Sequence, residues 1–148
     1  MRYTLAFATL ATSVAAVGNA VVKNQCTSAI YAWSVSSTVS SQQTIAPNGN
    51  FSEPFHRDDT TGGIALKITR AADGLYNGSP QQIFSYSLDG ATVWYDLSTA
   101  FGEPFTGSKI TVTQEGSRSI EWPTGSNPGG SQVKAGVSER DVVFTACA

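Results

Sequence analysis

Residues 83–97 read IFSYSLDGATVWYDL, and this stretch decides the fold class. Two runs in which large apolar residues recur at every second position, residues 83–88 and 92–97, flank the sequence DGA at 89–91. Alternation with a period of two is typical of a strand with one buried face. Asp-Gly between two such runs is a strong hairpin signal, because both residues tolerate a positive φ. The sequence therefore predicts two antiparallel strands joined by a tight turn.

Similar runs recur along the whole chain. The further expected strands are residues 28–35, 64–69, 109–113, 119–122 and 142–145. Clusters of Pro, Asn, Gly and Thr separate several of them, and no convincing helical periodicity follows residue 20. Residues 116–136 are rich in Gly, Ser and Pro, so we expect a long surface loop there. Short strands with frequent turns predict an all-β single domain, a β-sandwich or barrel of antiparallel strands.

Composition excludes several classes of function. Only 14% of the 148 residues are charged, the formal net charge is -2, and Lys and Arg form no run. A nucleic-acid partner is therefore not expected, since its phosphates require a basic surface. Two cysteines and one histidine are too few for a zinc finger or a zinc ribbon. We predict neither a metal nor a cofactor.

Residues 1–20 have the layout of a secretory signal. Arg2 precedes an uncharged run rich in Ala, Leu and Val, and small residues follow this run. The apolar run is shorter than the about 20 residues of a membrane span; a buried N-terminal helix is the alternative. Cleavage after Ala16 or after Ala20 fits, and we expect Ala20 because Val21 then begins a strand. The predicted product is an exported monomer, residues 21–148, without a membrane span.

Export changes the interpretation of the cysteines and of two asparagines. In an oxidising compartment, Cys26 and Cys147 are expected to form a disulfide near the two ends of the domain; two free thiols are the alternative. Asn50 and Asn77 each begin an Asn-x-Ser sequence, so both are predicted glycosylation acceptors. Pro80 directly after the second sequence weakens that prediction.

Several segments resemble the thaumatin-like proteins. They are VKNQC at 22–26, IYAW at 30–33, QIFSYSL at 82–88, WYDLS at 94–98 and FTAC at 144–147. The chain is more closely similar to the short fungal antigens of the Blastomyces yeast-phase-specific protein family. The segments that carry this likeness are GGIALKI at 62–68, FGEPF at 101–105 and IEWP at 120–123. The resemblance covers residues 21–148. It implies a thaumatin-like β-sandwich and a secreted, cell-wall or surface-associated fungal protein, often antigenic, in a family without an agreed enzymatic activity.

The chain departs from this family in its cysteines. The resemblance implies a further cysteine pair, one cysteine just before IEWP and one just after Val133-Lys134. Here the corresponding positions hold residues 117–119 (Ser-Arg-Ser) and 135–136 (Ala-Gly). We therefore expect the loop between them to be less constrained than in such relatives.

Weak β-glucan hydrolysis is the alternative function that the resemblance suggests. Glycoside hydrolysis needs two carboxyl groups about 5–9.5 Å apart. Asp96 matches the acid of the family's Tyr-Asp motif, but the position of a second family acid falls near Ser85. The partner would have to come from Asp58, Asp59 or Glu103. The competing interpretations are a structural hydrogen-bond acceptor for Asp96 and a solvated turn for the two aspartates beside Arg57.

Two other enzyme classes lack their residues. Copper-dependent oxidative cleavage needs two histidines, one of them N-terminal, and His56 is the only histidine. A Ser-His-Asp triad would also have to use His56, and the chain has no Gly-x-Ser-x-Gly sequence. We expect His56 to be a surface or interface residue.

Carbohydrate binding requires an aromatic face beside polar groups. Of the three tryptophans we expect Trp94 and Trp122, rather than Trp33, to be exposed. Together with Arg57 they are the candidate ligand contacts. The leading hypothesis is a non-enzymatic protein that binds cell-wall β-glucan or a host surface protein. An antigen or effector without a glycan role is a further alternative.

Overall fold

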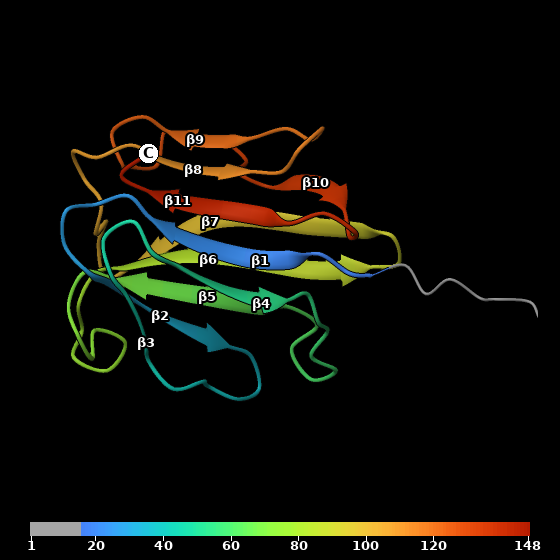
Figure 1. The fold of residues 1–148 in the computed structure, drawn as a ribbon, viewed down its shortest axis with the longest axis horizontal. Coiled ribbons are helices and arrows are strands. Elements are labelled where there is room, and N and C mark those ends of the chain that lie inside the picture. The colour runs from blue at the N-terminus through green and yellow to red at the C-terminus, as the bar shows by residue number, and fades with distance from the viewer. Residues whose placement is uncertain (1–15) are drawn as a thin grey trace, which may run out of the picture.

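The computed structural model describes residues 16–148, which form two β-sheets packed face to face (Figure 1). The five-stranded sheet has the order β4 (Asn50–Pro54), β1 (Asn19–Asn24), β11 (Val142–Ala146), β8 (Ile110–Thr113), β9 (Ile120–Trp122). The six-stranded sheet has the order β10 (Lys134–Val137), β7 (Thr92–Ala100), β6 (Gln81–Asp89), β5 (Ile64–Thr69), β2 (Ile30–Val35), β3 (Gln43–Ile45). The predicted all-β sandwich is confirmed.

The predicted hairpin is the pair β6 and β7. Its ladder runs from Gln81 opposite Ala100 to Asp89 opposite Thr92. Asp89 therefore closes the ladder, and the loop consists of Gly90 and Ala91 alone. Gly90 has a φ of 58°, and a two-residue loop with glycine at positive φ suits the right-handed twist of paired strands.

The first and last strands lie side by side in the middle of the five-stranded sheet. β1 and β11 pair in parallel, with Val22 opposite Phe144, whereas the other strand pairs are antiparallel. The predicted disulfide joins Cys26 to Cys147 just beyond this ladder, where their Cα atoms are 5.0 Å apart. β1 begins two residues earlier than expected, at Asn19. The predicted secretory signal lies mostly outside the described residues and stays a prediction.

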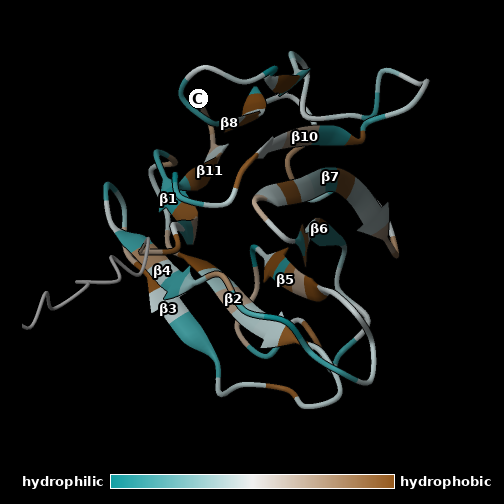
Figure 2. Ribbon diagram, turned by 90° about the vertical axis from the view of Figure 1, so that its right-hand side faces the viewer, coloured by the Kyte–Doolittle hydropathy of each residue, from teal (hydrophilic) through white to brown (hydrophobic). Residues whose placement is uncertain are grey.

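The core fills the space between the sheets because alternate residues of each strand point inward. In β6 and β7 these are Phe84, Tyr86, Val93, Tyr95 and Leu97, all buried. The six-stranded sheet curves around the five-stranded one, which is visible when the strands are seen nearly end on (Figure 2). The other face of the six-stranded sheet carries Ser85, Ser87, Trp94 and Asp96, and this face holds the candidate site.

Three strands were missed by the sequence interpretation. β3, β4 and β10 are edge strands of three to five residues, with few buried side chains. Without a buried face they lack the alternating pattern that identifies a strand. Within residues 16–148 no helix has the length and apolarity of a membrane crossing, and no three His, Cys, Asp or Glu side chains gather as metal ligands would.

Candidate functional site

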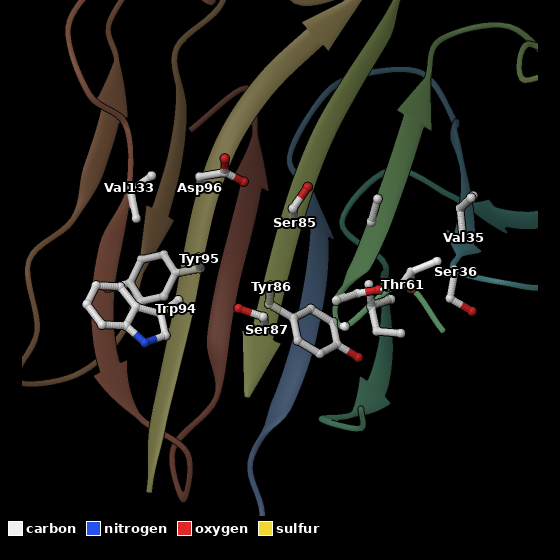
Figure 3. A pocket seen from close by; sticks show the side chains of 14 residues that line it. Val35, Ser36, Thr61, Ser85, Tyr86, Ser87, Trp94, Tyr95, Asp96 and Val133 are labelled. Atoms are coloured by element: carbon white, nitrogen blue, oxygen red, sulfur yellow. Dashed lines mark hydrogen bonds between the residues drawn. The ribbon is translucent and has the colours of Figure 1, made fainter. Parts of the chain in front are cut away.

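A groove of about 670 Å³ crosses the outer face of the six-stranded sheet (Figure 3). Its floor follows one row of cross-strand neighbours. Asp96 lies opposite Ser85, Ser85 opposite Ala65, and Ala65 opposite Val35. Because the side chains of Ser85 and Ala65 are small, the groove is open in the middle of this row. The groove therefore runs across four strands, β7, β6, β5 and β2, rather than along one of them.

Trp94 forms an apolar wall at the β7 end of the groove. Its side chain is on the outer face, opposite Ser87, and the residue is 45% exposed. Val133, which precedes β10, lies at the same end (Figure 3). The prediction that Trp94 is exposed is confirmed. An exposed indole beside a polar floor offers the flat apolar surface on which a sugar ring stacks.

Asp96 supplies an unsatisfied acceptor to this floor. The residue is half-buried, and its Oδ1 atom is buried without a hydrogen-bond partner in the protein. Burial raises the pKa of the carboxyl group, and the hydroxyl of Ser85 offsets part of that effect. A buried acceptor without a donor is unfavourable. A ligand hydroxyl that donates to Oδ1 would remove this cost.

The opposite wall consists of Ser36 and residues 61–63, and Asp58 holds it in place. The carboxylate of Asp58 accepts hydrogen bonds from the hydroxyl of Ser37 and from the backbone N–H groups of Thr60 (2.9 Å) and Thr61 (2.7 Å). These bonds, that of Ser37 foremost, hold the pKa of Asp58 well below its usual range. Asp58 does not line the groove; it fixes the loop that does.

The remaining acidic candidates lie away from the groove. Arg57 and Asp59 form a long ion pair, 3.9 Å from Nε to Oδ1, with both side chains well exposed. Glu103 accepts a hydrogen bond from the backbone N–H of Asn127 (2.8 Å), which holds its pKa below the usual range. It thereby ties the 123–132 loop to the segment after β7. Of the residues that line the groove, Asp96 alone carries a carboxylate.

The expectation of an exposed Trp122 is wrong. Its residue exposure is 0%, because β9 joins the five-stranded sheet with Ile120 and Trp122 facing the core. The indole Nε1–H donates to Oε1 of Gln132 (2.8 Å), so the loop folds back over this ring. Trp122 has no free face for a ligand.

A second polar cluster escaped the sequence interpretation. The hydroxyl of Tyr86 donates to Oε1 of Glu53 (2.9 Å), and Nδ1 of His56 lies 3.1 Å from that hydroxyl. Nδ1 also lies 3.1 Å from the carbonyl oxygen of Pro54. Burial and the adjacent carboxylate raise the pKa of Tyr86 far above its usual value. The cluster joins β4 of one sheet to β6 of the other.

The two predicted glycosylation acceptors are both exposed. Asn50 begins the edge strand β4, and Asn77 lies in the loop between β5 and β6. Oδ1 of Asn77 accepts hydrogen bonds from the backbone N–H of Ser79 (3.1 Å) and from its hydroxyl (2.5 Å). Modification of either asparagine stays a prediction.

Comparison with known proteins places these features in a family. Residues 7–148 match the family described as Blastomyces yeast-phase-specific protein. The "Antigenic thaumatin-like protein" of Arthroderma benhamiae is 29% identical over 97 residues, which cover 65% of this chain and 48% of that protein. The "Secreted thaumatin-like protein calA" of Emericella nidulans is 28% identical over 99 residues, covering 65% and 56%. The chain thus spans about half the length of the curated relatives that it matches.

Two solved structures share the fold. The protein elicitor MoHrip2 from Magnaporthe oryzae superposes with a TM-score of 0.72 at 22% identity, over 88% of this chain and 99% of that one. The thaumatin-like xylanase inhibitor TLXI superposes with a TM-score of 0.61 at 8% identity, over 86% and 98%. At these identities the likeness is one of architecture, and it confirms the thaumatin-like sandwich.

Proposed function

From the fact that this chain belongs to the Blastomyces yeast-phase-specific protein family, a thaumatin-like family, we propose that it is an exported fungal protein that binds neutral glycan chains in the groove of its six-stranded sheet. Cell-wall β-glucan and chitin are the first ligands to test. Export is supported by the predicted secretory signal and by a relative named as secreted. Binding is supported by the groove itself.

The observation that carries the proposal is Trp94 beside the unsatisfied Oδ1 atom of Asp96. A pyranose ring has an apolar C–H face and a rim of hydroxyl groups. Trp94 offers a partner for the face, and Asp96, Ser85 and Ser87 offer partners for the rim (Figure 3). No Lys or Arg lines the groove, so nothing there selects an anionic ligand.

Hydrolysis of the bound glycan would need a second carboxyl group in the groove. Asp58 and Glu103 accept backbone hydrogen bonds elsewhere, and Asp59 is paired with Arg57 on the surface. The residues that line the groove therefore suffice for binding a glycan, whereas cleaving it would need a second carboxyl group beside Asp96.

The test is retention on insoluble β-glucan and on chitin, with Trp94→Ala as the variant. Loss of one stacking contact is expected to weaken retention about tenfold. Phe101→Ala is the matched control, since Phe101 is an aromatic residue with 73% exposure that does not line the groove. Its retention should equal that of the wild type.

Equal retention of the Trp94→Ala and Phe101→Ala variants would contradict the groove as the binding site. Wild-type retention on neither polymer, with a host protein recovered instead, would favour the antigen or effector interpretation. Release of reducing sugar that Asp96→Asn abolishes would favour the hydrolase.

A further inference from the structure

We propose that the exported chain is cut after Ala16, so that the mature protein begins at Val17. The proposal rests on the export proposed above and concerns the processing site. The sequence allows cleavage after Ala16 or after Ala20, because both are small residues at the end of the apolar run. The structure distinguishes the two products by what each contributes to the folded domain.

Gly18 is already an integral part of the fold. It is buried, its N–H donates to the carbonyl of Ser138 (2.8 Å), and its carbonyl accepts from the N–H of Phe55 (2.9 Å). A Cβ atom at this position would lie 2.4 Å from the carbonyl carbon of Arg140. The chain therefore passes directly against the β10–β11 turn at Gly18, where only a glycine fits.

Asn19 and Ala20 extend the same contact. The backbone N–H and the side-chain amide of Asn19 both donate to Oδ1 of Asp141, at 2.7 and 2.8 Å. Ala20 has 0% exposure and lies opposite Val142 on one side and Glu53 on the other. Both residues belong to β1, which is central in its sheet.

Cleavage after Ala20 would remove this part of the core. The product would lose these four hydrogen bonds, the ladder pairing of Asn19 and Ala20, and the buried Ala20 methyl group. Its new terminal ammonium group, on Val21, would lie inside the ladder between Ser52 and Val143. The backbone groups of β4 and β11 that pair with Asn19 and Ala20 would also lose their partners, which is costly.

Cleavage after Ala16 leaves every contact described above in place. Ala16 and Val17 are both exposed, and Gly18 is the first buried residue of the part of the chain that the structure describes. The terminal ammonium group then stays in water, one residue before the first hydrogen bond. A product that lacks residues 17–20 folds less stably, so we expect the folded protein that accumulates to be the one that retains the whole of β1.

Two measurements test the proposal. The first is intact mass and N-terminal sequencing of the protein from the culture filtrate of a fungal host that expresses the full chain. The expected first residue is Val17. The second compares the melting temperatures of three oxidised chains, released from a cleavable tag, that begin at Ala16, Val17 and Val21.

The Ala16 chain is the matched control, because it differs from the Val17 chain by one exposed residue and should melt with it. The Val21 chain is expected to melt on the order of 10 °C lower, or not to fold. A filtrate protein that begins at Val21, or equal melting of all three chains, overturns the proposal. Retention of the uncut chain in the cells overturns export and processing together, whereas an exported protein that begins at Val17 but binds no glycan overturns only the binding function.

Discussion

Gln114 and Gly136 are in direct contact, and the contact leaves no room for a side chain at Gly136. A Cβ atom there would lie 1.9 Å from Oε1 of Gln114. Gln114 is buried, and its Oε1 accepts hydrogen bonds from the N–H of Val137 (2.8 Å) and the hydroxyl of Ser117 (2.9 Å). Its Nε2 donates to the carbonyls of Val137 and Arg140, both at 2.9 Å. One glutamine thus fixes β10 and the turn that follows it.

This network stands where the family resemblance implies a second cysteine pair. Ser117 and Gly136 belong to the two replaced segments, and a Cβ atom at Gly136 would lie 3.1 Å from Oγ of Ser117. The two segments therefore meet in space. Hydrogen bonds through Gln114 provide the constraint that the sequence interpretation expected the loop to lack.

Replacing Gln114 with alanine is expected to destabilise the protein by about 2–4 kcal/mol, because several buried backbone groups lose their partners together. Urea unfolding followed by tryptophan fluorescence measures the change. Glu115→Ala is the control: its side chain is exposed and the variant should stay within about 0.5 kcal/mol of wild type. A Gln114→Ala effect as small as that of the control would show that water replaces the glutamine.

Replacing Asp96 with asparagine is expected to stabilise the protein at neutral pH while weakening glycan binding. Burial raises the pKa of Asp96 in the folded state above the 3.8 of the unfolded chain. The free energy of unfolding therefore falls as the pH rises from 3.8 to the higher folded pKa, because the unfolded chain loses its proton first. Asparagine does not ionise, and the half-buried site suggests a gain of up to about 1 kcal/mol. Thermal melts at pH 7 and pH 3 measure it.

The gain should be present at pH 7 and absent at pH 3, where the wild-type carboxyl group is protonated in both states. Ser98→Ala, on the same face of β7, is the control that leaves the charge unchanged. A destabilised Asp96→Asn variant at pH 7 would mean that the carboxylate has a structural partner, as the competing sequence interpretation held.

Asp58 should have the opposite pH dependence. The pKa of Asp58 is lower in the folded state than the 3.8 of the unfolded chain. Its contribution to the free energy of unfolding is therefore complete above about pH 3.8 and is lost as the pH falls towards the folded pKa. The first local consequence is release of residues 60–63, of which 61–63 form the wall of the groove. Hydrogen exchange at the Thr60 and Thr61 amides is expected to quicken below pH 3 relative to the intrinsic rate.

Asp58→Asn should show that faster exchange already at neutral pH, together with weaker glycan retention, while Asp59→Asn behaves as wild type. If both amides are as well protected from hydrogen exchange in Asp58→Asn as in the wild type, the wall does not depend on the charge of Asp58.

The hairpin and the disulfide were predictable because the first depends on adjacent residues and the second on the number of cysteines. The β6–β7 turn is encoded in a few adjacent residues, and two cysteines in an exported chain allow one pairing. The exposure of Trp94 was predicted correctly, whereas the burial of Trp122 was not. Both lie in alternating strands, and alternation does not say which face turns inward. Val93, Tyr95 and Leu97 take the inner face in β7, whereas Trp122 itself takes it in β9.

The groove could not be predicted from the sequence for a related reason. Its floor depends on the register of four strands, so that Asp96, Ser85, Ala65 and Val35 come into one row. Register over such sequence distances is set by packing of the opposite face rather than by any of these residues. Asp96 was identified from the family motif alone, and nothing in the sequence around Asp58 indicated that it supports the wall.

Removing the disulfide should cost stability without changing the fold. Cys26 and Cys147 are separated by 121 positions, so the bond constrains nearly the whole unfolded chain. A Cys26→Ala, Cys147→Ala double variant is expected to lose about 2–5 kcal/mol of unfolding free energy. The β1–β11 ladder, from Ala20–Val142 to Asn24–Ala146, does not need the bond for its register, because Val22 and Phe144 are held in the core. The far-ultraviolet circular dichroism spectrum and cooperative unfolding should therefore persist at a lower denaturant midpoint. A double variant with a coil-like spectrum would show that the covalent link, rather than core packing, brings the first and last strands together.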